Sequence, residues 1–334
     1  GLAKYSRSHD SLQDNLLSLS QEKAAQFLQT FYFSYGHASI ADLAHIALAI
    51  EDISMLAAME VVDEPIWDGQ ERSTRYQDFT SAPFYRSASN NASYDQMMHN
   101  LFTQYHLLWD ESFNQLQRLY PNPGLSNSSY LRTLKARAFD IARYLLPLGT
   151  LTSLGQITSA RVLEQQISRL LSSDYTEVRQ IAESMKQAAT TDAPFHLPSV
   201  SEDDPVAPTL IKYAQAQPYA SLRNAALHAA ACQYFSKTFA ESFEDVELFL
   251  VDSLSDHQLA ILLYAEVKLP YRIVIDRVKS LSAREKDDLW ALAFRNRGPH
   301  DEWPRAFRLE PLLFDITMDV GAFRDFNRHR RLTK

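Results

Sequence analysis

The sequence predicts an α+β protein that is mostly helical. Apolar residues recur at helical spacing along most of the 334 residues, whereas the strongest strand pattern is the run from Val246 to Val251. A hydrophobic fraction of 46% supplies real cores, and only eight glycines argue against a loop-rich all-β fold. This length has room for two ordinary domains or one large one.

The first half of the chain is expected to be helical with one ambiguous stretch. A helix opens at Ser20, and a long amphipathic helix runs from Tyr94 to Leu119, where Asn122-Pro123-Gly124 ends it. Residues 39–62 mix helical and extended patterns, and Ala47–Ile50 favours a strand. Three more helices are expected, at Ser129–Leu146, Ile157–Leu171 and Tyr175–Gln187.

The composition changes after residue 190. Prolines and acidic residues concentrate up to Pro208, as in an exposed linker. Beyond the linker the pattern predicts helices at Pro208–Phe239, Ala265–Leu281 and Ala283–Arg295.

Composition also limits the classes of function. A net charge of −8 and a pI near 5.7 argue against general nucleic-acid binding. The single cysteine, Cys232, is expected to be buried, and it permits neither an internal disulfide nor a cysteine metal site. No metal-binding helix, phosphate loop or nucleophile elbow occurs, and the histidines do not pair at ligand spacing, so no metal is expected.

The same reasoning addresses location. The longest apolar segment, residues 43–62, is interrupted by Glu51, Asp52 and Glu60, which predicts that no membrane span is present. The first residues lack the apolar stretch of a secretory leader. A cytoplasmic protein is therefore expected.

A basic cluster stands out near the end of this acidic chain. Residues 323–331 contain four arginines and a histidine, which favours an anionic ligand. The residues before this cluster parallel an earlier part of the chain. Gly36–Asp42 leads into Ile46–Glu51 at the same spacing with which Pro304–Glu310 leads into Phe314–Asp319. The spacing suggests two copies of one unit, although two unrelated amphipathic segments would also produce it.

Two sets of residues could bind a phosphate. Glu71–Tyr76 places a hydroxyl and guanidinium groups in one short loop, although Ser73 could instead cap a helix. Arg143 precedes an apolar run, and Arg161 and Arg169 lie eight residues apart on one predicted helix face. Structural pairing of these arginines with nearby acids is the alternative. The acids nearest in sequence are Glu164, Asp174 and Glu177.

Four segments in order resemble the flavin-dependent thymidylate synthases. Members share Gly-His-x-Ser/Thr, Ser-x-Arg-Tyr, Ala-Arg-x-x-Leu-Pro-Leu and Arg-x-x-Ser-His-x-x-x-Glu. The corresponding segments here are Gly36–Ser39, Ser73–Tyr76, Ala142–Leu148 and Arg169–Glu177. The resemblance covers about residues 1–188, and the shared order makes it more specific than any single match.

The resemblance implies an antiparallel sheet beside the helices, a homo-oligomer and a set of site residues. It implies reductive methylation of dUMP with methylenetetrahydrofolate and NADPH, using FAD as cofactor. Arg169 would be the catalytic residue that stabilises charge on the pyrimidine. The implied dUMP-binding residues are Glu71, Ser73, Arg75, Arg143 and Arg169, and the implied FAD-binding residues are His37, Arg328, His329 and Arg330.

The FAD residues are divided because the chain departs from the family pattern. The family's Arg-His-Arg falls on Asp63-Glu64-Pro65, whose acids would repel flavin phosphates. Ser159 and Ser173 also stand where the family has Asn and His. The second copy has Arg328-His329-Arg330, and its own Ser-x-Arg-Tyr would fall beyond Lys334, so the chain is expected to continue.

We therefore expect a first copy at residues 1–188, a linker and connecting helix at 189–244, and a truncated second copy at 245–334. The two copies would build a composite site, with the nucleotide half from the first and the flavin half from the second. Two alternatives stay open: a catalytically degenerate nucleotide-binding or scaffold relative, and an enzyme of the same fold with another substrate.

Overall fold

The computed structural model describes residues 38–87, 89, 92–190, 211, 214–240, 242–299, 301–327 and 329, together with residues 11, 13, 14, 26 and 30. The chain forms two compact units. Unit 1 comprises Gly1–Leu171 and Tyr175–Gln215, and unit 2 comprises Ser172–Asp174 and Ala216–Lys334. The predicted helix at Ser20 and most of the predicted linker lie outside the described residues. A mostly helical α+β fold with antiparallel sheets is confirmed. Within the described ranges, no helix combines the length and apolar character needed to cross a membrane.

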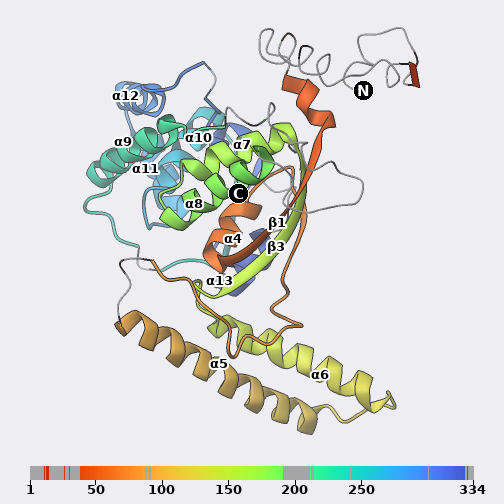
Figure 1. The fold of residues 1–334 in the computed structure, drawn as a ribbon. Coiled ribbons are helices and arrows are strands. Elements are labelled where there is room, and N and C mark those ends of the chain that lie inside the picture. The colour runs from red at the N-terminus through yellow and green to blue at the C-terminus, as the bar shows by residue number, and fades with distance from the viewer. Residues whose placement is uncertain are drawn as a thin grey trace. The chain divides into compact units, whose positions relative to one another are not determined.

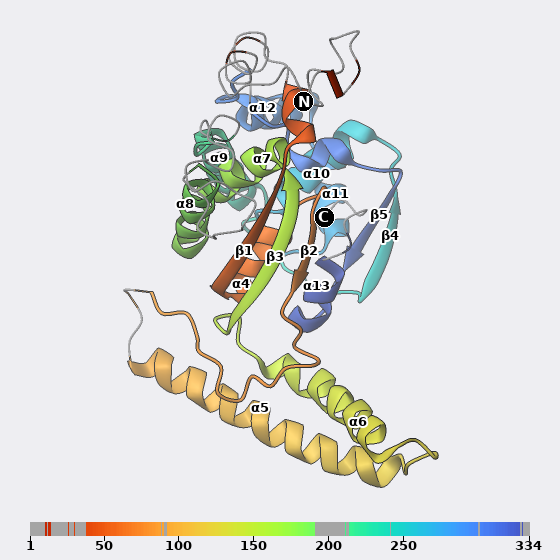
Figure 2. The same cartoon turned by 45° about the vertical axis from the view of Figure 1, so that its right-hand side comes forward.

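Unit 1 contains a three-stranded antiparallel sheet in the order β1-β3-β2 (Figure 2). Strand β1 (His45–Ser54) pairs along β3 (Leu151–Ser159), and the short β2 (Asp68–Glu71) pairs with the other edge of β3. The helix predicted from Ile157 was therefore wrong at its start. Its first three residues complete β3, because side chains alternate between buried and exposed there.

Helices α4 (Met55–Val62), α7 (Ala160–Leu171) and α8 (Thr176–Thr190) pack with this sheet around one core (Figures 1 and 2). Ser54 ends β1 and caps α4 by accepting a hydrogen bond from the Ala57 amide at 3.0 Å. Glu177 on α8 accepts bonds from both the amide and the hydroxyl of Ser54, at 2.7 and 2.6 Å. These bonds fix the angle between strand and helix, and so place the residues that follow α4.

Two long helices form a hairpin with its own small core (Figure 1). Helix α5 (Ala92–Leu119) matches the helix predicted at Tyr94–Leu119. Helix α6 (Asn127–Ala142) continues as a 3-10 turn, η3 (Arg143–Leu145), and stops before Pro147, as the steric restriction on the residue before proline requires. Arg143 therefore sits at the point where helix becomes turn.

Unit 2 is built from helices around a two-stranded sheet. Its helices are α9 (Pro218–Tyr234), α10 (Leu254–Tyr264), α11 (Tyr271–Ser280), α12 (Ala283–Phe294) and α13 (Val320–Asn327). Strand β4 (Val246–Leu250) pairs antiparallel with β5 (Leu312–Ile316).

Two helix predictions in unit 2 need correction. The helix predicted from Pro208 begins at Pro218, because proline suits the first turn of a helix. The helix predicted at Ala265–Leu281 begins at Tyr271, after the N-cap Pro270, and is preceded by the unpredicted α10. The helix predicted at Ala283–Arg295 is confirmed by α12.

Among the described residues, the order 3-10 helix, strand, helix occurs in both units, twice in unit 1 and once in unit 2. In unit 1, η2 (Ala38–Leu43) precedes β1 and α4; in unit 2, η4 (Arg305–Arg308) precedes β5 and α13. Helices η2 and η4 each begin seven residues before the strand that follows them. The same order of elements also appears in η3, β3 and α7 of unit 1. Because this order is not specific to one element set per unit, the two copies and their boundaries at 188 and 245 remain predictions.

Candidate nucleotide-binding site

The loop after β2 brings the first predicted site residues to the edge of the sheet. Glu71 ends β2 opposite Leu154 of β3. Ser73 follows, and its hydroxyl accepts a hydrogen bond from the Arg75 amide at 3.2 Å, inside the turn formed by residues 74–76. No helix begins at Ser73, so the hydroxyl shapes a turn rather than capping a helix. The turn points the chain toward α6.

Asp140 on α6 lies between two of the predicted dUMP arginines. The Nε of Arg75 lies 2.8 Å from one carboxylate oxygen, and the Nε of Arg143 lies 3.3 Å from the other. The Arg143 side chain is only 12% exposed, so this charge is largely desolvated and needs an anion beside it. The structure thus brings Arg75 and Arg143 together on the carboxylate of Asp140.

Arg169 on α7 has a separate set of partners. Its Nε donates to Glu64 Oε1 at 2.7 Å, and its Nη2 donates to the Glu60 carbonyl oxygen at 2.7 Å. The Glu60 carboxylate lies 3.7 Å from Nη1. Arg161 on the same helix pairs with Asp42 at 3.2 Å. Acids distant in the sequence, rather than the nearby Glu164, Asp174 and Glu177, supply these ion pairs.

Of the four residues expected to bind flavin, only His329 lies among the described residues. His37, Arg328 and Arg330 lie outside the described residues. His329 is described, and its amide donates to the Phe326 carbonyl at 3.0 Å just after α13. In unit 1 the matching position after α4 carries Asp63 and Glu64, with Glu60 one turn earlier. Carboxylates at these positions do not suit a diphosphate, because like charges repel.

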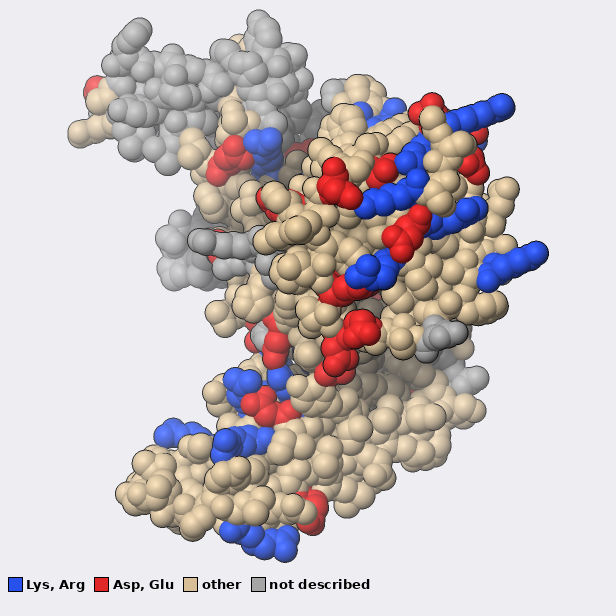
Figure 3. All heavy atoms as spheres, turned by 180° about the vertical axis from the view of Figure 1, so that it is seen from behind, with Lys and Arg blue, Asp and Glu red and all other residues tan. Residues whose placement is uncertain are grey.

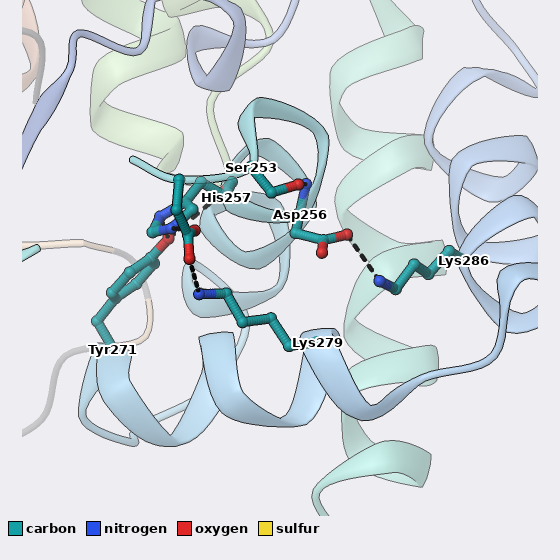
Figure 4. Close-up of polar contacts among 7 residues, drawn as sticks. Ser253, Asp256, His257, Tyr271, Lys279 and Lys286 are labelled. Carbon is teal, nitrogen blue, oxygen red and sulfur yellow. Dashed lines mark hydrogen bonds and ion pairs between the residues drawn. The ribbon is translucent and has the colours of Figure 1, made fainter. Parts of the chain in front are cut away.

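A buried polar network in unit 2 was missed by sequence reasoning (Figure 4). His257 on α10 is 1% exposed; its Nε2 lies 3.1 Å from Asp252 Oδ1 and its Nδ1 lies 2.9 Å from the Tyr271 hydroxyl. Because a carboxylate only accepts, Nε2–H donates to Asp252, and in that tautomer the Tyr271 hydroxyl donates to Nδ1. Burial raises the pKa of Tyr271, which keeps its donor proton in place. The separation of these residues along the chain offered no motif that would reveal them.

Lysines complete this network at the start of α10. Lys279 on α11 donates to Asp252 at 2.7 Å, and Lys286 on α12 donates to Asp256 at 2.8 Å (Figure 4). The hydrogen bond from Lys279 is the main cause that lowers the pKa of Asp252 to about 2. Two lysines from neighbouring helices therefore compensate acids at one helix terminus, which is a structural role.

Cysteine and metal chemistry give the site no further groups. Cys232 is exposed, contrary to the prediction of burial, because it lies on the outer side of α9. Among the described residues, no three His, Cys, Asp or Glu side chains are placed to hold a metal ion.

Comparison with known proteins identifies the family. The sequence profile described as "Thymidylate synthase complementing protein" matches residues 2–195, which is more than half of the chain. The chain belongs to this family. The matched region contains β1 to α8, and with them Arg75, Arg143 and Arg169.

The curated relatives that match this chain are longer than it. A UPF0159 protein of Chlamydia muridarum is 28% identical over 97% of this chain and 63% of its own length. One from Chlamydia pneumoniae is 27% identical over 94% of this chain and 60% of its own length. A UPF0159 protein of Thermoplasma acidophilum is 23% identical over 99% and 71%. The chain thus spans about three fifths of the two chlamydial relatives.

Two solved structures were also matched. Thymidylate synthase X of Helicobacter pylori, solved with FAD and dUMP, has a TM-score of 0.31 and 16% identity over 50% of this chain and 77% of its own. The UMP/dUMP methylase PolB of Streptomyces cacaoi, bound to 5-Br dUMP, has a TM-score of 0.34 and 18% identity over 56% and 83%.

Proposed function

We propose that unit 1 binds dUMP or a closely related pyrimidine nucleotide, with Arg75 and Arg143 holding its phosphate. The observation that carries this proposal is the placement of both guanidinium groups on Asp140. Each guanidinium is a planar fork of donors that suits phosphate oxygens. Two such forks lie against the Asp140 carboxylate, in a chain whose net charge is −8.

Glu71 and Ser73 would complete this nucleotide site. Glu71 ends β2, and Ser73 lies in the turn that follows, where its hydroxyl accepts a hydrogen bond from the Arg75 amide. The sheet therefore positions both residues close to Arg75. A carboxylate accepts from ring N–H or sugar hydroxyl groups, and a serine hydroxyl both donates and accepts. The same loop would therefore contact polar groups of the nucleotide other than the phosphate.

The chemical step of this proposal is reductive methylation of dUMP with methylenetetrahydrofolate, NADPH and FAD. FAD would supply the redox chemistry, and its phosphates would need Arg328, His329 and Arg330, because residues 60–64 of unit 1 carry acids. Arg169 would stabilise negative charge on the pyrimidine. To do so, it would have to break its hydrogen bond with Glu64 and contact the pyrimidine instead. The bond from Arg169 to Glu64 favours the second candidate, a nucleotide-binding relative that does not catalyse methylation.

Calorimetric titration of dUMP into the whole chain tests nucleotide binding. We expect Arg143→Gln and Arg75→Gln each to weaken binding at least about tenfold, since each removes a charged donor. Arg161→Gln is the matched control, because that arginine pairs with Asp42 outside the site. Equal affinity in Arg143→Gln and the wild type would rule out this phosphate site.

Flavin dependence separates the two candidate functions. The catalytic candidate predicts a spectral change on FAD titration and NADPH oxidation that dUMP stimulates. The non-catalytic candidate predicts dUMP binding without either signal. Homo-oligomerisation and a cytoplasmic location remain predictions, and sedimentation of the purified chain measures the former.

A further inference from the structure

A pocket of about 370 Å³ lies on the outer side of α6. Residues along most of that helix line it, from Ser128 to Phe139, together with Tyr76 from the loop after β2. This volume lies within the range of small-molecule sites, which is about 300–1,000 Å³. All of the lining residues belong to unit 1, and none has been assigned a role above.

The pocket is basic. Arg132 and Lys135 line it, both are exposed, and within the described part of the chain neither has a hydrogen-bond or ion-pair partner. Asp140, the only acidic residue of α6, is directed to Arg75 and Arg143 instead. Seen from behind, basic side chains predominate over acidic ones on the α5–α6 hairpin, at the bottom of Figure 3. Cations without acidic partners in a concave site favour an anionic ligand.

The start of α6 adds to this positive potential. Ser126 is the N-cap of this 16-residue helix, so Ser128 in the pocket lies in the first turn. Amide groups of a first turn carry partial positive charge and attract anions. The helix terminus therefore adds positive potential at the Ser128 end of the pocket.

Two aromatic rings give the pocket its shape. Tyr76 is 66% exposed and its hydroxyl has no hydrogen-bond partner among the described residues, so its ring is available for stacking. Phe139 is half-buried and rests on Trp109 with ring centroids 5.2 Å apart, which makes it a rigid wall. Planar rings bind between aromatic walls by stacking. The pocket thus combines ring recognition with anion recognition.

We propose that this pocket binds a planar heteroaromatic ring that carries a phosphate or carboxylate group. The ring would lie against Tyr76 and Phe139, with the anionic group beside Arg132 and Lys135. Because Tyr76 follows Arg75 and Phe139 precedes Asp140, the ligand would lie next to the proposed nucleotide site. The proposal does not depend on dUMP binding. The anionic group could be a nucleotide phosphate or a folate carboxylate, and the experiment below distinguishes these two sources.

The test titrates AMP and, separately, 5-formyltetrahydrofolate into the full chain. We expect at least one probe to bind saturably, and Arg132→Gln/Lys135→Gln to weaken it at least about tenfold. Tyr76→Ser, which removes the stacking ring, should weaken it at least about threefold. Arg137→Gln is the matched control, because it removes the same charge from α6 outside the pocket, where Arg137 stacks on Tyr120 at 4.9 Å.

The outcomes distinguish this pocket from the nucleotide site. AMP binding identifies a nucleotide source, and 5-formyltetrahydrofolate binding identifies a folate-like source. Three results would overturn the proposal. The first is that neither probe binds saturably below about 1 mM. The others are that the double variant and Arg137→Gln weaken probe binding equally, or that only Arg143→Gln weakens it. Retention of dUMP binding in the double variant shows that the two sites fail independently, and circular dichroism verifies that the helices remain folded.

Discussion

Arg169 Nε donates a hydrogen bond to Glu64 Oε1 at 2.7 Å, although 105 sequence positions separate the two residues. Glu64 occupies the place where the family resemblance leads one to expect a basic residue for flavin phosphate. Arg169 is the residue expected to act on the pyrimidine. In unit 1 an acid therefore lies where a cofactor-binding base was expected, and it pairs with the arginine that was expected to act on the substrate.

Breaking this pair should destabilise unit 1. Glu64 is 11% exposed and Arg169 is 27% exposed, so Arg169→Ala leaves a largely buried carboxylate without its charged donor. We expect a loss of about 2 kcal/mol in the free energy of unfolding, measured by urea denaturation. Arg161→Ala is the control on the same helix; its ion pair is more than 40% exposed on both sides, and should cost less than about 0.5 kcal/mol. Equal losses in both variants would contradict a specific role for Glu64.

Asp140→Asn should tighten dUMP binding while it destabilises the fold. Asparagine keeps an oxygen for Arg75 but removes the negative charge that competes with phosphate, worth roughly 1 kcal/mol or about fivefold in affinity. The loss of the charged partner of Arg143 should cost about 1 kcal/mol of stability. Calorimetry and urea denaturation measure the two effects. Asp95→Asn, at the exposed pair with Arg86, should change neither quantity appreciably. Weaker dUMP binding in Asp140→Asn would mean that the phosphate does not lie beside Asp140.

Tyr271→Phe should destabilise unit 2. The Tyr271 hydroxyl is the partner of His257 Nδ1, and both side chains are almost fully buried, so its removal leaves a ring nitrogen without a donor. The expected cost is about 1–2 kcal/mol in the free energy of unfolding, measured in urea. Tyr76→Phe removes a hydroxyl that has no partner in the described residues, and serves as the control. A cost for Tyr271→Phe no larger than for Tyr76→Phe would show that the His257 contact contributes nothing to stability.

Lys279→Met should alter the acid sensitivity of unit 2. The hydrogen bond from Lys279 holds the pKa of Asp252 at about 2, below its ordinary value of 3.8. A carboxylate whose pKa is depressed by folding stabilises the native state above pH 3.8, and this contribution is lost as the pH falls toward 2. Lys279→Met removes the largest cause of the lowered pKa, while the hydrogen bond from His257 remains, so this contribution shrinks and unfolding midpoints should fall less steeply across that interval. Lys268→Met removes a lysine that is not among the partners of Asp252, so it should keep the wild-type dependence of the unfolding midpoint on pH. The same pH dependence in the wild type, Lys279→Met and Lys268→Met would contradict the role given to Lys279.

Local patterns in the sequence predicted several elements well. The apolar stripe of residues 94–119 predicted α5 almost to the residue. The helix predicted at Ala283–Arg295 corresponds to α12, whose N-cap is Ser282. Strand β3 was missed, because its buried face consists of Thr152, Leu154, Gln156 and Thr158 and thus shows no apolar alternation. Gln156 is acceptable there since it bonds to Trp67 and Gln166, at 2.8 Å each, and such partners cannot be inferred from composition.

The sequence by itself determined the family, through motifs in a fixed order, and with it the types of residue available for a nucleotide site. It also determined the acids at residues 63 and 64, where the family motif has Arg-His-Arg. Only the tertiary structure decided which charges meet. Arg75 and Arg143 share Asp140, while Arg169 turns to Glu60 and Glu64, because the antiparallel pairing of β1 with β3 and the packing of α7 and α8 on that sheet bring together residues about a hundred positions apart. Ion pairs depend on distance in space, and local spacing carries no information about it.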